Sequence, residues 1–118
     1  MTNTGFWLKL DQLVATHNVI VDRPHGSRHP RYPDFVYPLD YGYLENTQAG
    51  DGGGIDVWVG SLPHKSVTAI VCTVDLLKHD TEVKILLGCT PQEAQTVLTT
   101  HNDEMDFQSA ILVERTDD

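Results

Sequence analysis

Basic residues are scarce in this chain. Its 118 residues include 8 Lys and Arg against 17 Asp and Glu, which gives a formal net charge of −9. Because a negative surface repels polyanions, this composition argues against a nucleic-acid partner bound through a basic groove. A small phosphate compound stays compatible with the sequence, since a metal ion would neutralise the local negative field that opposes an anionic ligand.

Long apolar runs and paired cysteines are also lacking. No run approaches the roughly 18 to 20 apolar residues that cross a bilayer, and the first residues do not have the pattern of a secretory signal. Cys72 and Cys89 stand apart in apolar runs, which indicates buried free thiols. We therefore expect a cytoplasmic protein with no membrane partner, and the length predicts a single domain over residues 1–118.

The spacing of apolar residues predicts two helices and several short strands. One helix is expected over residues 5–16, capped by Thr4. A second is expected from Thr90 to about residue 100, with Pro91 at its first position and Glu93 completing a capping box. Runs of β-branched residues predict strands at 19–21, 57–59, 67–74 and 83–87, and 110–113 is a last short strand or a helix end. This pattern is typical of a mainly β protein with flanking helices (α+β), a small closed or partly closed barrel.

An acidic, glycine-rich turn precedes the strand at 57–59. Asp51 and Asp56 frame three glycines, which let the backbone turn tightly enough to aim both carboxylates into one small volume. Such a pair is stable only with a cation or a shared proton between the two groups, and Mg²⁺ is the natural candidate. Asp-Gly turns that merely join strands have the same composition, so a turn without a ligand is the alternative.

Two later features add charged side chains that fit a phosphate site. Asp80 is expected in the turn of a hairpin with Glu82 two residues on, so both can point to the same side, with Lys84 next on that face. A charged edge hairpin that discourages aggregation would have the same pattern. Arg28 and Arg31 lie on a proline-rich loop, where they either clamp phosphate oxygens or simply keep the loop solvated.

Two tyrosines complete the candidate site. Tyr37 and Tyr41 are four residues apart, and Pro38 and Gly42 bend the backbone, so both phenols are expected to face one cleft. A phenolic hydroxyl donates well to a phosphate oxygen. Ordinary half-buried packing is the alternative for tyrosines in β proteins.

The segment from residue 37 to residue 60 resembles the soluble family I inorganic pyrophosphatases. Residues 37–43 read YPLDYGY and residues 51–59 read DGGGIDVWV, similar to the family pattern YP-x-x-YG-(F/Y) followed by DGDP-x-DV. Residues 20–28 and 76–84 resemble the flanking family segments, although a hairpin before the YP motif is missing. The resemblance implies a shortened pyrophosphatase-like domain over residues 1–118, built as an OB-like five-stranded β barrel with a helix packed on it.

The resemblance also implies a reaction and a set of site residues. It implies a metal-dependent hydrolase of phosphoanhydrides that converts inorganic pyrophosphate to two phosphates with Mg²⁺ or Mn²⁺. Asp51 and Asp56 would be catalytic. The metal ligands would be Asp51, Asp56, Glu82 and Asp80, and the substrate-binding residues would be Tyr41, Lys84, Arg28, Arg31 and Tyr37.

The sequence departs from the family pattern at the glycine turn. Gly53 stands where the family has its second aspartate, and Gly54 stands where it has proline. Loss of a ligand and base commonly costs orders of magnitude in rate. Two functions therefore stay open: a hydrolase with weak activity or an altered, larger substrate, and a non-catalytic descendant that binds a metal or a partner. A homo-oligomer is compatible with both.

Overall fold

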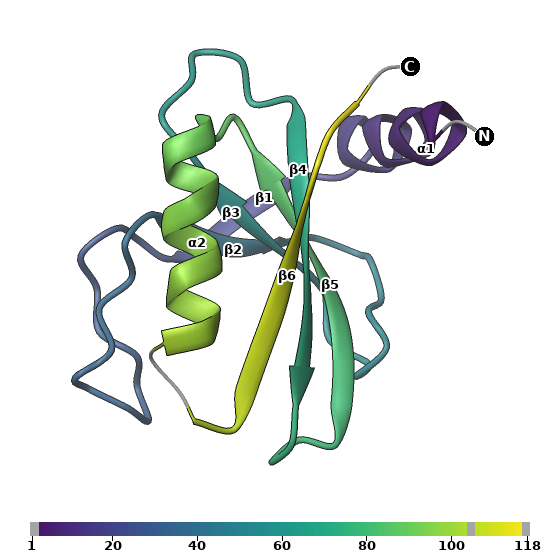
Figure 1. Ribbon diagram of the computed structural model, residues 1–118. Coiled ribbons are helices and arrows are strands. Elements are labelled where there is room, and N and C mark those ends of the chain that lie inside the picture. The colour runs from purple at the N-terminus through teal and green to yellow at the C-terminus, as the bar shows by residue number, and fades with distance from the viewer. Residues whose placement is uncertain (1–2, 104–105, 117–118) are drawn as a thin grey trace.

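The computed structural model describes residues 3–103 and 106–116, which form two helices and one mixed sheet (Figure 1). The sheet order is β1-β2-β3-β5-β4-β6, and β3 and β5 run parallel while the other neighbours are antiparallel. The elements are α1 (Thr4–Ala15), β1 (Val19–Arg23), β2 (Asp40–Leu44), β3 (Ile55–Val59), β4 (Val67–Asp75), β5 (Asp80–Leu87), α2 (Pro91–Asp103) and β6 (Gln108–Glu114).

The mainly β class with flanking helices is confirmed, and the number and closure of the strands need correction. The described strands number six rather than five, and they form an open sheet. The reason is the strand pairing: β1 bonds only to β2 and β6 only to β4, so these two strands remain edges of the sheet. In Figure 1 the sheet is strongly twisted, and β2 crosses behind the upright β4 and β6.

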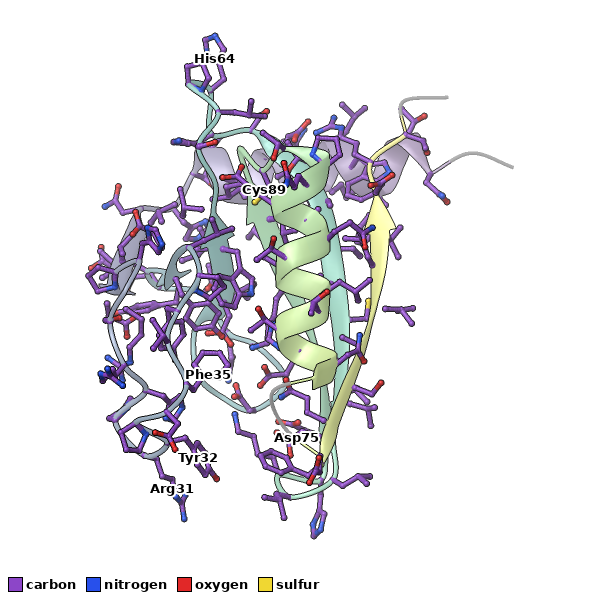
Figure 2. All side chains as sticks on the ribbon, turned by 60° about the vertical axis from the view of Figure 1, so that its left-hand side comes forward. Arg31, Tyr32, Phe35, His64, Asp75 and Cys89 are labelled. Atoms are coloured by element: carbon purple, nitrogen blue, oxygen red, sulfur yellow. The ribbon has the colours of Figure 1, made fainter. Side chains whose placement is uncertain are left out.

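The loop between β1 and β2 is held in place by its own backbone. The amide of His29 donates to the carbonyl of Phe35, and the amide of Tyr37 donates to the carbonyl of Ser27, both at 2.9 Å. Figure 2 shows Arg31, Tyr32 and Phe35 on this loop, at the end of the molecule opposite to His64. The proline-rich segment therefore forms a defined wall beside the sheet.

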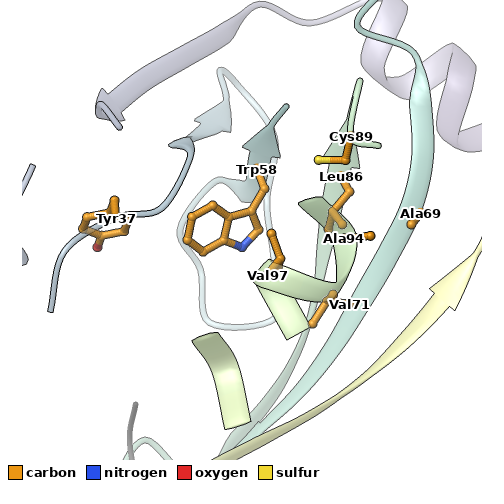
Figure 3. Packing of buried hydrophobic residues seen from close by; sticks show 8 residues of the cluster. All are labelled: Tyr37, Trp58, Ala69, Val71, Leu86, Cys89, Ala94 and Val97. Carbon is orange, nitrogen blue, oxygen red and sulfur yellow. The ribbon is translucent and has the colours of Figure 1, made fainter. Parts of the chain in front are cut away.

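Helix α2 covers one face of the sheet and begins as the sequence predicts. The hydroxyl of Thr90 accepts from the amide of Glu93 (3.1 Å), and the Glu93 carboxylate accepts from the amide of Thr90 (2.9 Å). Beneath the helix, Ala94 and Val97 pack against Trp58 and its neighbours on the sheet (Figure 3). The helix continues to Asp103, beyond the end expected at about residue 100, and residues 104–105 lie outside the described part.

Helix α1 covers the opposite face through Trp7, which is 1% exposed. It begins one residue earlier than expected. The N-cap position is Asn3 rather than Thr4, and Asn3 makes no side-chain cap hydrogen bond. Arg115, after β6, instead holds the helix by two hydrogen bonds to the Asp11 carboxylate (2.7 and 2.9 Å), with its guanidinium 5.9 Å from the Trp7 ring centre.

The two cysteines are free, with Cys89 buried and Cys72 partly buried. Burial raises the pKa of the Cys89 thiol to about 12, so this side chain is an inert packing residue at neutral pH. Within residues 3–103 and 106–116, neither helix is long and apolar enough to cross a membrane.

Candidate active site

The candidate site lies on the sheet face that α2 partly covers. On β3, Asp56 and Trp58 share this face because side chains two apart on a strand point the same way. Glu82 and Lys84 do the same on β5, and the register places Tyr41 of β2 opposite Trp58. The parallel pairing of β3 with β5 then brings Asp56 beside Lys84.

Lys84 is the centre of this arrangement. Its ammonium donates to Tyr41 Oη (2.8 Å), Asp56 Oδ2 (2.8 Å) and Glu82 Oε2 (3.0 Å), while only 6% of its side chain is exposed. Burial alone would lower the pKa of Lys84, but the interactions with Tyr41, Asp56 and Glu82 outweigh it and raise the pKa above its ordinary value. Burial raises the pKa of Tyr41, so its phenol stays neutral beside a permanently charged ammonium.

Asp51, Asp80 and Glu82 come together beyond Lys84, and we call them the three-carboxylate group. One carboxylate oxygen from each lies within 4.8 Å of the others. The side chain of Glu82 is 6% exposed, and its Oε1 is buried without a hydrogen-bond partner. An unpartnered buried carboxylate oxygen costs free energy, so this position calls for a cation or a proton.

The pKa shifts of two members of this group point in opposite directions. Burial and, to a lesser degree, the neighbouring Asp51 carboxylate raise the pKa of Glu82, although Lys84 partly opposes this. The Glu82 contact and the Gly53 amide, which donates to Asp51 Oδ1 at 3.0 Å, lower the pKa of Asp51. A raised pKa at Glu82 beside a lowered pKa at Asp51 indicates that the two carboxylates interact, and a single proton or cation between them would relieve their repulsion.

These residues fit a divalent metal ion. Mg²⁺ and Mn²⁺ prefer carboxylate oxygens, and the three-carboxylate group supplies them around a buried acceptor that has no partner in the protein. Asp56 is not part of the group, although its Oδ2, like Oε2 of Glu82, accepts a hydrogen bond from Lys84. Of the four metal ligands predicted from the sequence, the structure brings Asp51, Asp80 and Glu82 together and leaves Asp56 outside the group, bonded to Lys84.

A cleft of about 610 Å³ is lined in part by Lys84 and by no member of the three-carboxylate group, and we call it the aromatic cleft. Tyr37 and Tyr41 both line it, with ring centres 5.4 Å apart, as their spacing predicts. Arg31 also lines the cleft. Arg28 does not, since its guanidinium is exposed and donates to the carbonyl of Pro33 (2.9 Å) on the same loop.

The sequence analysis missed a buried hydrogen-bond chain along the floor of the cleft. Trp58 Nε1 donates to His101 Nε2 (3.1 Å), so Nδ1 of this histidine carries the proton and donates to Gln108 Oε1 (2.7 Å). The amide of Gln108 then donates to Asp75 Oδ2 (3.3 Å). The helical spacing of Ala94, Val97 and His101 is the signal that could have placed the histidine on the buried face.

Comparison with known proteins points to one fold. No family model matches the chain. An alignment 61 positions long, which covers 39% of this chain, shows 34% identity to an inorganic pyrophosphatase of Leifsonia xyli subsp. xyli and covers 37% of that relative's length. Among solved structures, inorganic pyrophosphatases from Neisseria gonorrhoeae (TM-score 0.66, 17% identity) and Coxiella burnetii (TM-score 0.59, 14% identity) each align with 81% of this chain. The alignments cover 80% and 84% of those two chains, respectively. The chain thus has the inorganic pyrophosphatase fold, and the resemblance seen in its motifs is confirmed.

Proposed function

We propose that this chain, which shares the fold of the inorganic pyrophosphatases, is a metal-dependent hydrolase of phosphoanhydrides, with inorganic pyrophosphate as its simplest substrate. The observation that carries the proposal is the three-carboxylate group, with its buried, unpartnered Glu82 oxygen, beside the Lys84 ammonium. Asp51, Asp80 and Glu82 would hold Mg²⁺ or Mn²⁺. When bound, such a cation supplies charge neutralisation for the phosphates and activation of water.

The remaining residues have roles that follow from their contacts. Tyr41 donates its O–H to a phosphate oxygen from the cleft side while its oxygen accepts from Lys84, whose positive charge attracts the phosphate, and Arg31 lines the same cleft. Asp56, oriented by Lys84, accepts the proton of the attacking water. Water adds to one phosphorus as the bond from that phosphorus to the bridging oxygen breaks, and the proton passes to the departing phosphate, so that two phosphate ions leave.

Replacing Glu82 with glutamine is expected to lower metal-dependent phosphate release from pyrophosphate about a hundredfold, because the amide removes a negative ligand from the charged site. Titration calorimetry with Mn²⁺ should show weaker binding in the same variant. Asp56→Asn should keep the Mn²⁺ affinity and lose turnover, since Asp56 lies outside the three-carboxylate group.

Glu114→Gln, at an exposed position of β6, is the control and should behave like the unchanged protein. Mn²⁺ binding without any metal-dependent turnover would favour the rival function, a non-catalytic descendant that binds a metal or a partner. Equal Mn²⁺ affinity in Glu82→Gln and Glu114→Gln would count against the metal site itself. A cytoplasmic location and assembly into a homo-oligomer stay predictions.

Gly53 explains why the activity is expected to be weak, and it offers a gain-of-function test. A Cβ at this position would meet only Asp51, with its nearest atom, Oδ1, at 3.4 Å, an ordinary contact, and the backbone does not have a positive φ. An aspartate therefore fits there and adds a fourth carboxylate near the group. Gly53→Asp is expected to raise phosphate release from pyrophosphate about tenfold, on the scale of one added general base.

Gly50→Asp is the matched control for this variant. It adds the same charge on the same loop, where a Cβ would meet no atom within 4 Å, so it separates a local ligand from a general change in charge. An equal response of the two variants in the steady-state phosphate assay would argue against a role for position 53.

A further inference from the structure

The aromatic cleft is larger and more apolar than a bare diphosphate requires. Its volume of about 610 Å³ lies in the range of sites that enclose organic ligands. Ring side chains from the β1–β2 loop, the sheet and the turn before β6 line it: Tyr32, Phe35, Tyr37, Tyr41, Trp58 and Phe107. Phosphate oxygens gain little from such walls, whereas a planar organic ring stacks on them.

Two of these rings come from different segments and lie close together in the cleft. Tyr32 lies on the β1–β2 loop and Phe107 lies just before β6, with ring centres 6.4 Å apart and planes inclined at 44°. A ring inserted between two others needs about 3.5 Å on each side, so a small outward shift of the loop would admit one. A second hollow of about 440 Å³ shares Tyr32, Phe35 and Phe107 with the cleft and extends it outward.

The charges around the cleft favour an anionic ligand. Arg31 and Lys78 line it, and among the described residues neither side chain forms an ion pair, although the protein as a whole carries a formal charge of −9. Lys84 lies at its inner end. The carboxylate of Asp75 is 3% exposed, and it accepts hydrogen bonds from the amides of Leu77 and Lys78 and from Gln108. Arg31 and Lys78 therefore outnumber Asp75, which is the one carboxylate among the described residues that line the cleft.

We propose that the aromatic cleft binds the nucleoside part of a nucleoside diphosphate, with the diphosphate directed along Lys84 toward the three-carboxylate group. Tyr32 and Phe107 hold the base by stacking, and Arg31 and Lys78 neutralise the phosphates. The hydrolytic step rests on the proposed function. In it, water adds to the terminal phosphorus and the bond to the bridging oxygen breaks. A nucleoside monophosphate leaves with that oxygen, inorganic phosphate forms, and a proton is released.

Two ligands that cannot be hydrolysed at the bridge isolate the role of the nucleoside. α,β-Methylene adenosine diphosphate and methylenediphosphonate carry the same P–C–P unit, and only the first carries a base. Calorimetric titration in the presence of Mg²⁺ is expected to show at least tenfold tighter binding of the adenosine compound, the scale of one base stacked on an aromatic side chain. Tyr32→Ala and, separately, Phe107→Ala should each remove most of that difference.

His64→Ala removes an exposed ring at the far end of the molecule (Figure 2) and should keep the difference intact. Equal affinity for the two ligands would overturn the inference, and phosphate release from pyrophosphate in a parallel assay would then leave the proposed function standing. A difference that survives in both cleft variants would also overturn it. Failure of both ligands to bind, together with the absence of metal-dependent turnover, would overturn both the inference and the proposed function.

Discussion

Replacing Lys84 with methionine is expected to lower the free energy of unfolding by about 3 to 5 kcal/mol, because it leaves the carboxylates of Asp56 and Glu82 without their shared counter-charge. The ammonium is almost completely buried and bonds to both groups at 3.0 Å or less. Methionine fills similar volume but neutralises nothing. Urea denaturation at pH 7, followed by tryptophan fluorescence, measures the loss.

Two further variants test the cause of this loss. Lys9→Met changes an exposed lysine of α1 and should cost less than about 0.5 kcal/mol. Adding Glu82→Gln to Lys84→Met should recover part of the stability, since one of the two uncompensated charges disappears. The effects of the two substitutions on the free energy of unfolding are therefore not expected to add, because the two residues are in contact. A loss below about 1 kcal/mol in Lys84→Met would mean that this ion pair behaves like an exposed one.

The stability of the protein is expected to fall in mild acid through His101. Burial, with a smaller contribution from the Lys84 charge, lowers the pKa of this imidazole to about 4 from an ordinary value of 6.5. A pKa that is depressed in the folded state means that the unfolded chain takes up the proton first. The contribution of His101 is therefore complete above pH 6.5, falls as the pH is lowered toward 4, and amounts to about 3 kcal/mol over that window.

His101→Gln supplies the comparison, because glutamine can accept from Trp58 and donate to Gln108 without titrating. Urea denaturation of both proteins at pH 7 and pH 4 should show that the variant loses about 3 kcal/mol less than the unchanged chain. Carboxylates such as Asp11 titrate equally in both proteins and cancel in this difference. If the free energy of unfolding falls equally with pH in the unchanged protein and in His101→Gln, the pKa of the imidazole is not lowered in the folded protein.

The parts of the fold that could be predicted are those encoded by neighbouring residues. The capping box at Thr90 specifies the start of α2 locally, and the hairpin of β4 and β5 joins two strands across one short turn. Strand β2 was missed because Gly42 suggested a bend. In the sheet this glycine is needed because a Cβ would collide with the Ile20 carbonyl of β1, a contact between segments that no local pattern reveals.

The same distinction applies to the candidate site. Alternation on β5 correctly placed Glu82 and Lys84 on one face. The attachment of Asp56 to Lys84 depends on the parallel pairing of β3 with β5, which the order of residues does not specify. The chain of hydrogen bonds from Trp58 through His101 and Gln108 to Asp75 likewise joins β3, α2, β6 and β4. Only the folded arrangement brings these four elements together.

The contact between Asp11 and Arg115 has a kinetic consequence. It joins residues 104 positions apart, so a folding molecule must close a very long loop before the contact can form. Contacts of such high sequence separation form late, after the hairpin of β4 and β5 and the α2 cap have assembled from local interactions. Helix α1 would then be the last layer to dock in folding and the first to detach under stress, while the side of the sheet that holds the candidate site stays intact.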